Sequence, residues 1–79
     1  MSPKLPVVKA KDLIRILPKM GFKMARQTGS HFIFRHEINH KIVPVPMHSN
    51  LEIKKGTLLS ILKQADITKE KLVELIRKN

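Results

Sequence analysis

Apolar residues recur at two different spacings along the 79 residues of this chain, and the spacing predicts which segments are helical and which are extended. Leu13, Ile14, Leu17 and Met20 recur every three or four positions, which is the period of a helix with one buried face. We expect this first helix to begin at about residue 11. Pro18 removes a backbone hydrogen bond, so the helix should end or kink near residue 17.

Between residues 22 and 46 the pattern changes to short β-forming runs separated by turn residues. We expect strands at about 22–26, 30–35 and 41–45, with a turn at 27–30 and a polar connection at 37–39. Pro44 and Pro46 cannot donate to a β-ladder, which places the third strand at a sheet edge or ends it early. The short connections indicate an antiparallel meander.

The helical period returns at about residue 54. The apolar stripe that predicts the second helix consists of Leu58, Ile61, Leu62 and Ala65. Thr68 has the side chain of a helix cap, and it precedes a last helix over about 68–78. Two prolines in residues 1–9 suggest a loose arm.

The order of elements predicts a single domain over residues 1–79. Two helices on one face of a three-stranded antiparallel sheet form a two-layer α+β sandwich, in the order α-β-β-β-α with an extra C-terminal helix. Strand alternation then assigns the side chains to faces. The residues expected to face the helices from the first two strands are Phe22, Met24, Phe32 and Phe34. The open face carries Lys23, His31 and Arg35, which make a positive surface with one imidazole.

The charge of the chain narrows the class of partner. Sixteen Lys and Arg against six Asp and Glu give a formal net charge of +10. The simplest partner is a phosphate backbone, although an acidic protein or an anionic membrane surface fits the same number. Three phenylalanines are the only aromatic residues, which argues against a sheet that stacks single-stranded bases on aromatic rings. Without cysteine or a long apolar run, a cytoplasmic protein that does not enter a membrane is expected.

One motif points to chemistry that its context does not support. Residues 36–40 spell H-E-x-x-H, the signature of zinc proteases. That motif binds zinc only when both histidines lie on one helix face. Here it lies between two β-rich runs, so we interpret His36 and His40 as exposed turn histidines and expect no metal or other cofactor.

His31 is the candidate for catalysis. Histidine has an ordinary pKa of about 6.5 and exchanges protons near neutral pH. RNA carries its own nucleophile, the 2′-hydroxyl, so a positioned base or acid can cleave it without metal. Gly29 would supply positive φ or allow a close backbone approach. Ser30 would donate to a phosphate oxygen or cap the turn, and His48 would act as a second proton-transfer group, contact phosphate or be an exposed loop residue.

Four basic residues are further candidates for phosphate contacts. Lys54 and Lys55 begin the second helix, where free backbone N–H groups attract anions. Lys23 and Arg35 lie on the expected open face. The alternative for the lysine pair is an ordinary solvated surface.

Three segments closely resemble the HicA (YcfA-like) toxin family. They are R-Q-T-G-S-H-F-I-F-R-H at 26–36, V-P-V-P-M-H at 43–48 and K-G-T-L-L-S-I-L-K-Q-A at 55–65. With the first helix, the resemblance covers about residues 11–67. Asp66 stands where the family usually has glycine, and the last helix lies beyond the shared part.

The resemblance implies a double-stranded-RNA-binding-like fold and an mRNA interferase, which is a ribosome-independent ribonuclease and the toxin half of a toxin–antitoxin pair. The family's catalytic histidine falls on His31. The implied partner is a HicB-type antitoxin, which masks the site and supplies any DNA binding of the complex.

Three hypotheses follow from the sequence. The first is a metal-independent endoribonuclease that cleaves mRNA with His31 as general acid or base. The second is a non-catalytic RNA-binding module with the same fold. The third is a subunit whose basic surface mainly serves an acidic protein partner.

Overall fold

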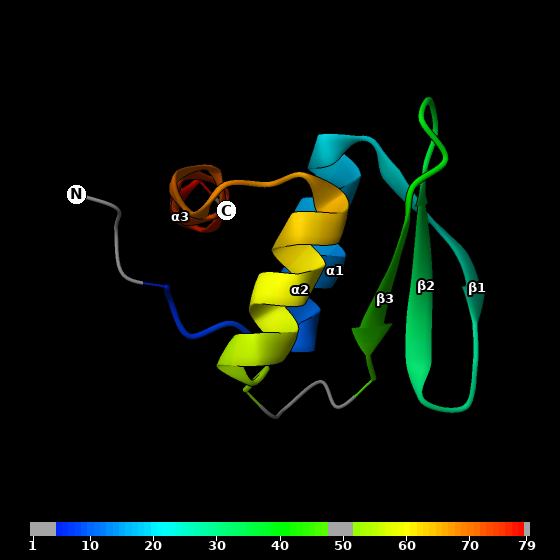
Figure 1. The fold of residues 1–79 in the computed structure, drawn as a ribbon, viewed down its shortest axis with the longest axis horizontal. Helices are drawn as coiled ribbons and strands as arrows, with labels where there is room; N and C mark the ends of the chain where they lie inside the picture. Colours follow the sequence, from blue (N-terminus) through cyan, green and yellow to red (C-terminus); the bar gives the residue numbers. More distant parts are fainter. Residues whose placement is uncertain (1–4, 48–51, 79) are drawn as a thin grey trace.

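The expected order of helices and strands is confirmed. The computed structural model describes residues 5–47 and 52–78 of the chain. Its elements are α1 (Ala10–Ile16), the 3₁₀ helix η1 (Leu17–Met20), β1 (Phe22–Gln27), β2 (His31–His36), β3 (Ile42–Pro46), α2 (Lys55–Ala65) and α3 (Lys69–Arg77). This is the α+β arrangement of a double-stranded-RNA-binding-like fold. Figure 1 shows α1 and α2 beside the sheet, with α3 on the side of this helix pair that faces away from the strands.

The first helix ends where proline and glycine predict. α1 stops at Ile16, and Pro18 lies in the first turn of η1. A backbone N–H in that turn would have no hydrogen-bond partner within the helix, so proline is tolerated there. Gly21 then adopts a left-handed conformation with φ of 90° and donates its N–H to the carbonyls of Leu17 and Pro18. The chain leaves this turn directly into β1.

The sheet has the order β1-β2-β3 with antiparallel neighbours, so β3 is an edge strand as its prolines predict. Val43 and Val45 are fully buried, whereas Pro44 and Pro46 point to the other face. The core that the helices and the sheet share consists of Val8, Ala10, Leu13, Ile16, Leu17, Phe22, Phe34, Val43, Val45, Ile53, Leu58, Ile61, Leu62, Ala65, Ile67, Leu72 and Leu75.

Met24 lies on the expected face, because it pairs with the buried Phe34, but it does not join the core, since its side chain is 45% exposed. β1 is the edge strand on the far side of β2 from β3, and its pairing register shifts between Met24 and Arg26. Only Phe22 of this strand is buried. The helices pack against β3, so they do not cover the middle of β1.

The expected loose arm over residues 1–9 is also too long. Val8 is fully buried, and its carbonyl accepts a hydrogen bond of 2.8 Å from the N–H of Ile53. Lys9 forms a β-bridge with Glu52. Residues 5–9 are therefore tied to the core and to the segment before α2, and residues 1–4 lie outside the described residues.

Both ends of the connection between α2 and α3 follow local rules. Asp66 ends α2 in a left-handed conformation with φ of 60°, the conformation in which glycine is favoured and aspartate is tolerated. This explains how the chain accommodates Asp66 at a position where the resemblance leads to glycine. Thr68 caps α3 as expected, because its Oγ1 accepts a 3.0 Å hydrogen bond from the N–H of Lys71.

Gly21 is the glycine that the fold requires. A Cβ at this position would lie 2.7 Å from Nε2 of His36, and φ is positive. We expect Gly21→Ala to lower the free energy of unfolding by about 2 kcal/mol, because the left-handed conformation alone costs about 1–2 kcal/mol. Urea unfolding followed by circular dichroism measures this change.

Gly29→Ala is the matched control, because nothing lies within 4 Å of a Cβ there and φ is not positive. We expect this variant to stay within about 0.5 kcal/mol of the parent protein. Equal losses in the two variants would contradict the assignment of Gly21.

Candidate active site

His31 is the first residue of β2 and follows a tight turn that Thr28 holds together. The N–H of Thr28 donates to the carbonyl of His31 at 2.9 Å. The Thr28 Oγ1 accepts from the N–H of His31 at 2.9 Å and from the N–H of Ser30 at 3.3 Å. This role of Thr28 was not predicted, and its only signal in the sequence is its place in a turn-forming cluster. The turn fixes the direction in which the imidazole leaves the strand.

Ser30 contacts the imidazole directly. Its Oγ lies 2.8 Å from Nδ1 of His31, at hydrogen-bond distance. The half-buried ring therefore has one nitrogen occupied by a neighbour and leaves Nε2 for another partner. Which of the two groups donates in this contact depends on the tautomer of the imidazole.

Gly29 does not have the positive φ that the sequence suggested. Among the described residues other than its two chain neighbours, no atom lies within 4 Å of the place where its Cβ would be. With respect to these residues, the turn beside Ser30 and His31 is open at Gly29.

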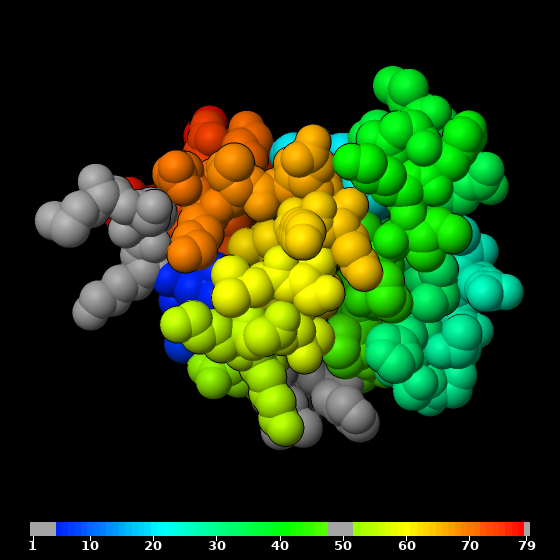
Figure 2. All heavy atoms as spheres, viewed as in Figure 1, coloured from blue at the N-terminus to red at the C-terminus, as the bar shows by residue number. Residues whose placement is uncertain are grey.

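The imidazole of His31 lines an open cleft of about 310 Å³ between the sheet and α2, which we call the His31 cleft. His31 pairs with Pro46 across the strands, so both side chains lie on the same face, opposite the buried Val45. The other lining residues are Pro44 of β3 and Gly56, Thr57, Ser60, Ile61 and Gln64 of α2. On the face drawn in Figure 2, α2 (yellow) lies directly beside the strands (green).

The contribution of α2 to this cleft was not predicted beyond its first turn. Thr57, Ser60 and Gln64 recur at helical spacing and form a polar row next to the apolar stripe of the same helix. That row is the sequence signal that could have identified them.

Two of the expected cationic residues lie in a second cleft. Lys23 and Arg35 are cross-strand partners and line an opening of about 400 Å³ with Ala25, His36, Glu37 and His40, which we call the Arg35 cleft. Arg35 lies four residues beyond His31 along β2, which corresponds to about 13 Å. The structure thus separates the cations of the open face from His31.

Both cations of the Arg35 cleft have partners. The Lys23 Nζ lies 2.8 Å from Oε1 of Glu37, and this hydrogen bond and ion pair raise the pKa of Lys23 and lower that of Glu37. The Arg35 guanidinium donates to Nδ1 of His40 at 3.0 Å. The positive charge available to a ligand here is reduced by one carboxylate.

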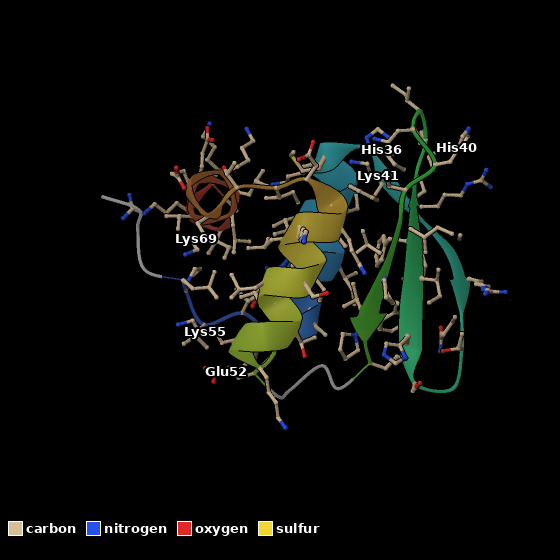
Figure 3. All side chains as sticks on the ribbon, in the orientation of Figure 1. His36, His40, Lys41, Glu52, Lys55 and Lys69 are labelled. Carbon is tan, nitrogen blue, oxygen red and sulfur yellow. The ribbon has the colours of Figure 1, made fainter. Side chains whose placement is uncertain are left out.

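The H-E-x-x-H segment is not helical, as its context predicted, and its two histidines differ. His36 is half-buried, stacks edge-to-face on Phe22 at 4.9 Å and accepts the N–H groups of Ile38 and Asn39 on Nδ1. The expectation of an exposed turn residue is therefore wrong for His36, which holds the β2–β3 turn. His40 is exposed (Figure 3). Within residues 5–47 and 52–78, no cluster of three metal-ligating side chains occurs.

The two lysines at the start of α2 do not line the His31 cleft. Lys54 is the exposed N-cap residue, and Lys55 begins the helix. Figure 3 shows Lys55 on the side of α2 that faces away from the sheet. At about 100° per residue, Lys55 lies nearly opposite the row of polar residues on α2. His48 lies outside the described residues.

The fold and the cleft define a class: a small, strongly basic α+β domain with a double-stranded-RNA-binding-like order of elements and a serine-positioned histidine in an open cleft. A family model described as the HicA toxin of bacterial toxin–antitoxin systems matches residues 10–67. The matched segment runs from α1 past the end of α2 and includes both walls of the His31 cleft. The chain belongs to the HicA toxin family.

A search of curated proteins returned no match. α3 lies beyond the segment that the family model matches. In the described part of the chain, no helix has the length and apolarity needed to cross a membrane.

The contact between Ser30 and His31 is testable by the tautomer of the ring. We expect Ser30→Ala to change the ratio of the two neutral tautomers of His31 about fivefold, because one hydrogen bond contributes about 1 kcal/mol. Nitrogen-15 NMR of the imidazole measures this ratio. Ser60→Ala is the control, since Ser60 lines the same cleft without a hydrogen bond to the ring. An unchanged ratio in Ser30→Ala would contradict the contact.

Proposed function

We propose that this chain is a toxin that cleaves mRNA as a metal-independent endoribonuclease, with His31 as the catalytic residue. The observation that supports this proposal is the imidazole in an open cleft, with Nδ1 held by Ser30, which leaves Nε2 for another partner. The formal net charge of +10 attracts a polyanionic substrate. Membership of the HicA family supports the toxin role.

The reaction uses the nucleophile that RNA carries. The 2′-hydroxyl oxygen attacks the adjacent phosphorus, a base takes the hydroxyl proton, and the 5′-oxygen leaves with a proton from an acid. When Ser30 accepts from Nδ1–H, the Nε2 lone pair of His31 is the base. In the imidazolium both nitrogens carry hydrogen, so Ser30 still accepts from Nδ1–H and Nε2–H is the acid.

The opposite proton transfer needs a second group. Among the described residues that line the cleft, His31 is the only one with an acid–base side chain. The second transfer therefore falls to solvent or to His48, which follows β3 in the sequence.

The phosphate backbone would extend along the sheet from the His31 cleft. We propose that the open turn at Gly29 and Ser30 accepts the phosphate at the cleavage site. Lys23 and Arg35, at the other end of β2, would hold a flanking phosphate, and Lys54 would hold another at the start of α2. Lys55 faces away from the cleft, so its contribution would be long-range attraction.

A HicB-type antitoxin is the proposed protein partner. A family of toxin–antitoxin systems implies an antitoxin, and covering the His31 cleft would silence the activity. In this proposal the toxin acts on mRNA in the cytoplasm and reaches DNA only through the antitoxin complex.

Cleavage of RNA in the presence of EDTA tests the proposal. We expect the parent protein to cut RNA without added metal and His31→Ala to cut at least about 100-fold more slowly, because a positioned acid or base contributes about 10²–10⁴ in rate. Binding of RNA should persist in this variant. The rate is measured on a labelled RNA by gel electrophoresis.

His40→Ala is the matched control, since it removes an exposed histidine outside the His31 cleft. The contact of His40 with Arg35 bears only on the proposed flanking phosphate, so this variant should keep most of the parental rate. Equal rates for His31→Ala and the parent would contradict the assignment of His31. A parent protein that binds RNA and never cuts it would instead identify the non-catalytic binding module.

A further inference from the structure

Among the described residues that line the His31 cleft, only His31 has a side chain that can carry a charge. None of the described lining residues of this cleft is Lys, Arg, Asp or Glu. In a chain with a formal net charge of +10, this is an uncharged region beside the proposed catalytic group. Phosphate is bound most strongly by cations, so walls without Lys or Arg favour an uncharged part of the RNA, the base, over a phosphate group.

The two sides of the cleft have the chemistry that a nucleobase requires. Pro44 and Pro46 offer apolar contacts to a base plane, whereas Ile61 is 2% exposed and belongs to the core beneath the cleft. The row of Thr57, Ser60 and Gln64 offers two hydroxyls and one amide, which together donate and accept hydrogen bonds. The Gln64 amide can form the paired contacts by which side chains distinguish base edges.

The size of the cleft suits one base. Its volume of about 310 Å³ lies at the lower end of the range for small-molecule sites, about 300–1,000 Å³. Such a space suits one heterocycle better than a base pair or a stack. Proteins read RNA sequence mainly on unpaired nucleotides, because the deep groove of the A-form helix does not admit side chains.

Gly56 is consistent with a ligand at this place. It lies in the first turn of α2, and its φ is not positive. A Cβ added at this position would have no described neighbour within 4 Å outside the adjoining helix backbone. Alanine would favour the helix by about 0.8–1.0 kcal/mol over glycine in a helix interior. The fold itself does not require a glycine here, whereas a ligand that enters the cleft would meet a Cβ.

We propose that the His31 cleft holds a single unpaired nucleobase next to the cleaved phosphodiester. Pro44 and Pro46 contact its face, and Ser60 and Gln64 bind its edge. This contact selects the nucleotide at which the RNA is cut. The proposal rests on the proposed ribonuclease function, which it extends from the reacting group to the recognition of sequence.

Mapping of cleavage positions tests this proposal with Gln64→Ala and Ser60→Ala. Both residues are exposed on α2, and alanine is a strong helix former, so the variants should fold. We expect the parent protein to favour one base at a fixed position about fivefold or more, as a good base contact contributes about 1–3 kcal/mol. In the variants this preference should fall to within about twofold. Leu59→Ala, on another side of α2, is the matched control and should keep the parental pattern.

Binding of uncleavable RNA separates this proposal from the ribonuclease function. Short 2′-O-methyl oligonucleotides of each base cannot supply the nucleophile, and their affinities are measured by fluorescence anisotropy. A base preference that Gln64→Ala abolishes would support the proposal even if no cleavage occurred. Identical affinities for all four bases, or a preference that both variants retain, would overturn it and leave His31-dependent cleavage standing. Variants that lose only antitoxin binding would also overturn it, because the cleft would then belong to a protein partner.

Discussion

The packing of α2 beside β3 is the contact on which both the core and the candidate site depend. In the run Val43-Pro44-Val45-Pro46, the valines face the core and the prolines face the His31 cleft. Prolines lack the N–H that a β-ladder needs, so they protect this sheet edge from pairing with a further strand. α2 buries Leu58, Ile61 and Leu62 in the core beside it and presents its polar row to the cleft.

In this arrangement the candidate catalytic histidine lies apart from the cationic side chains. The imidazole lies among neutral side chains, while the cations occupy the other end of β2 and the start of α2. Screening in cellular salt limits the range of exposed charges to about 8 Å, so distant lysines attract RNA without fixing its position. The position of the RNA would instead depend on short contacts in the cleft and at the turn that carries Ser30.

Local rules in the sequence predicted the elements and the sheet face on which His31 lies. Pro18 and Gly21 ended the first helix, the prolines placed β3 at an edge, and Thr68 began the last helix. Each of these outcomes depends on the geometry of one or two residues, which is why the sequence alone predicted them.

The features that were missed depend on contacts between distant segments. Val8 is buried because residue 53 pairs with it, and Met24 is exposed because the strand register shifts and the helices leave β1 uncovered. The cleft likewise needs the orientation of α2 against β3, which brings Ser60 and Gln64 to the same opening as His31. No spacing along the chain specifies that orientation. The polar row on α2 by itself marks only a face of the helix that lies outside the core.

The central claim is that the histidine of this cleft assists an attack by the 2′-hydroxyl of the RNA itself. The chemistry of the new RNA ends tests it most directly, by mass spectrometry of the products formed in EDTA. The account predicts fragments that end in a 2′,3′-cyclic phosphate and begin with a 5′-hydroxyl, both absent with His31→Ala. Fragments with 5′-phosphate ends would contradict it, because such ends arise when water rather than the 2′-hydroxyl is the nucleophile.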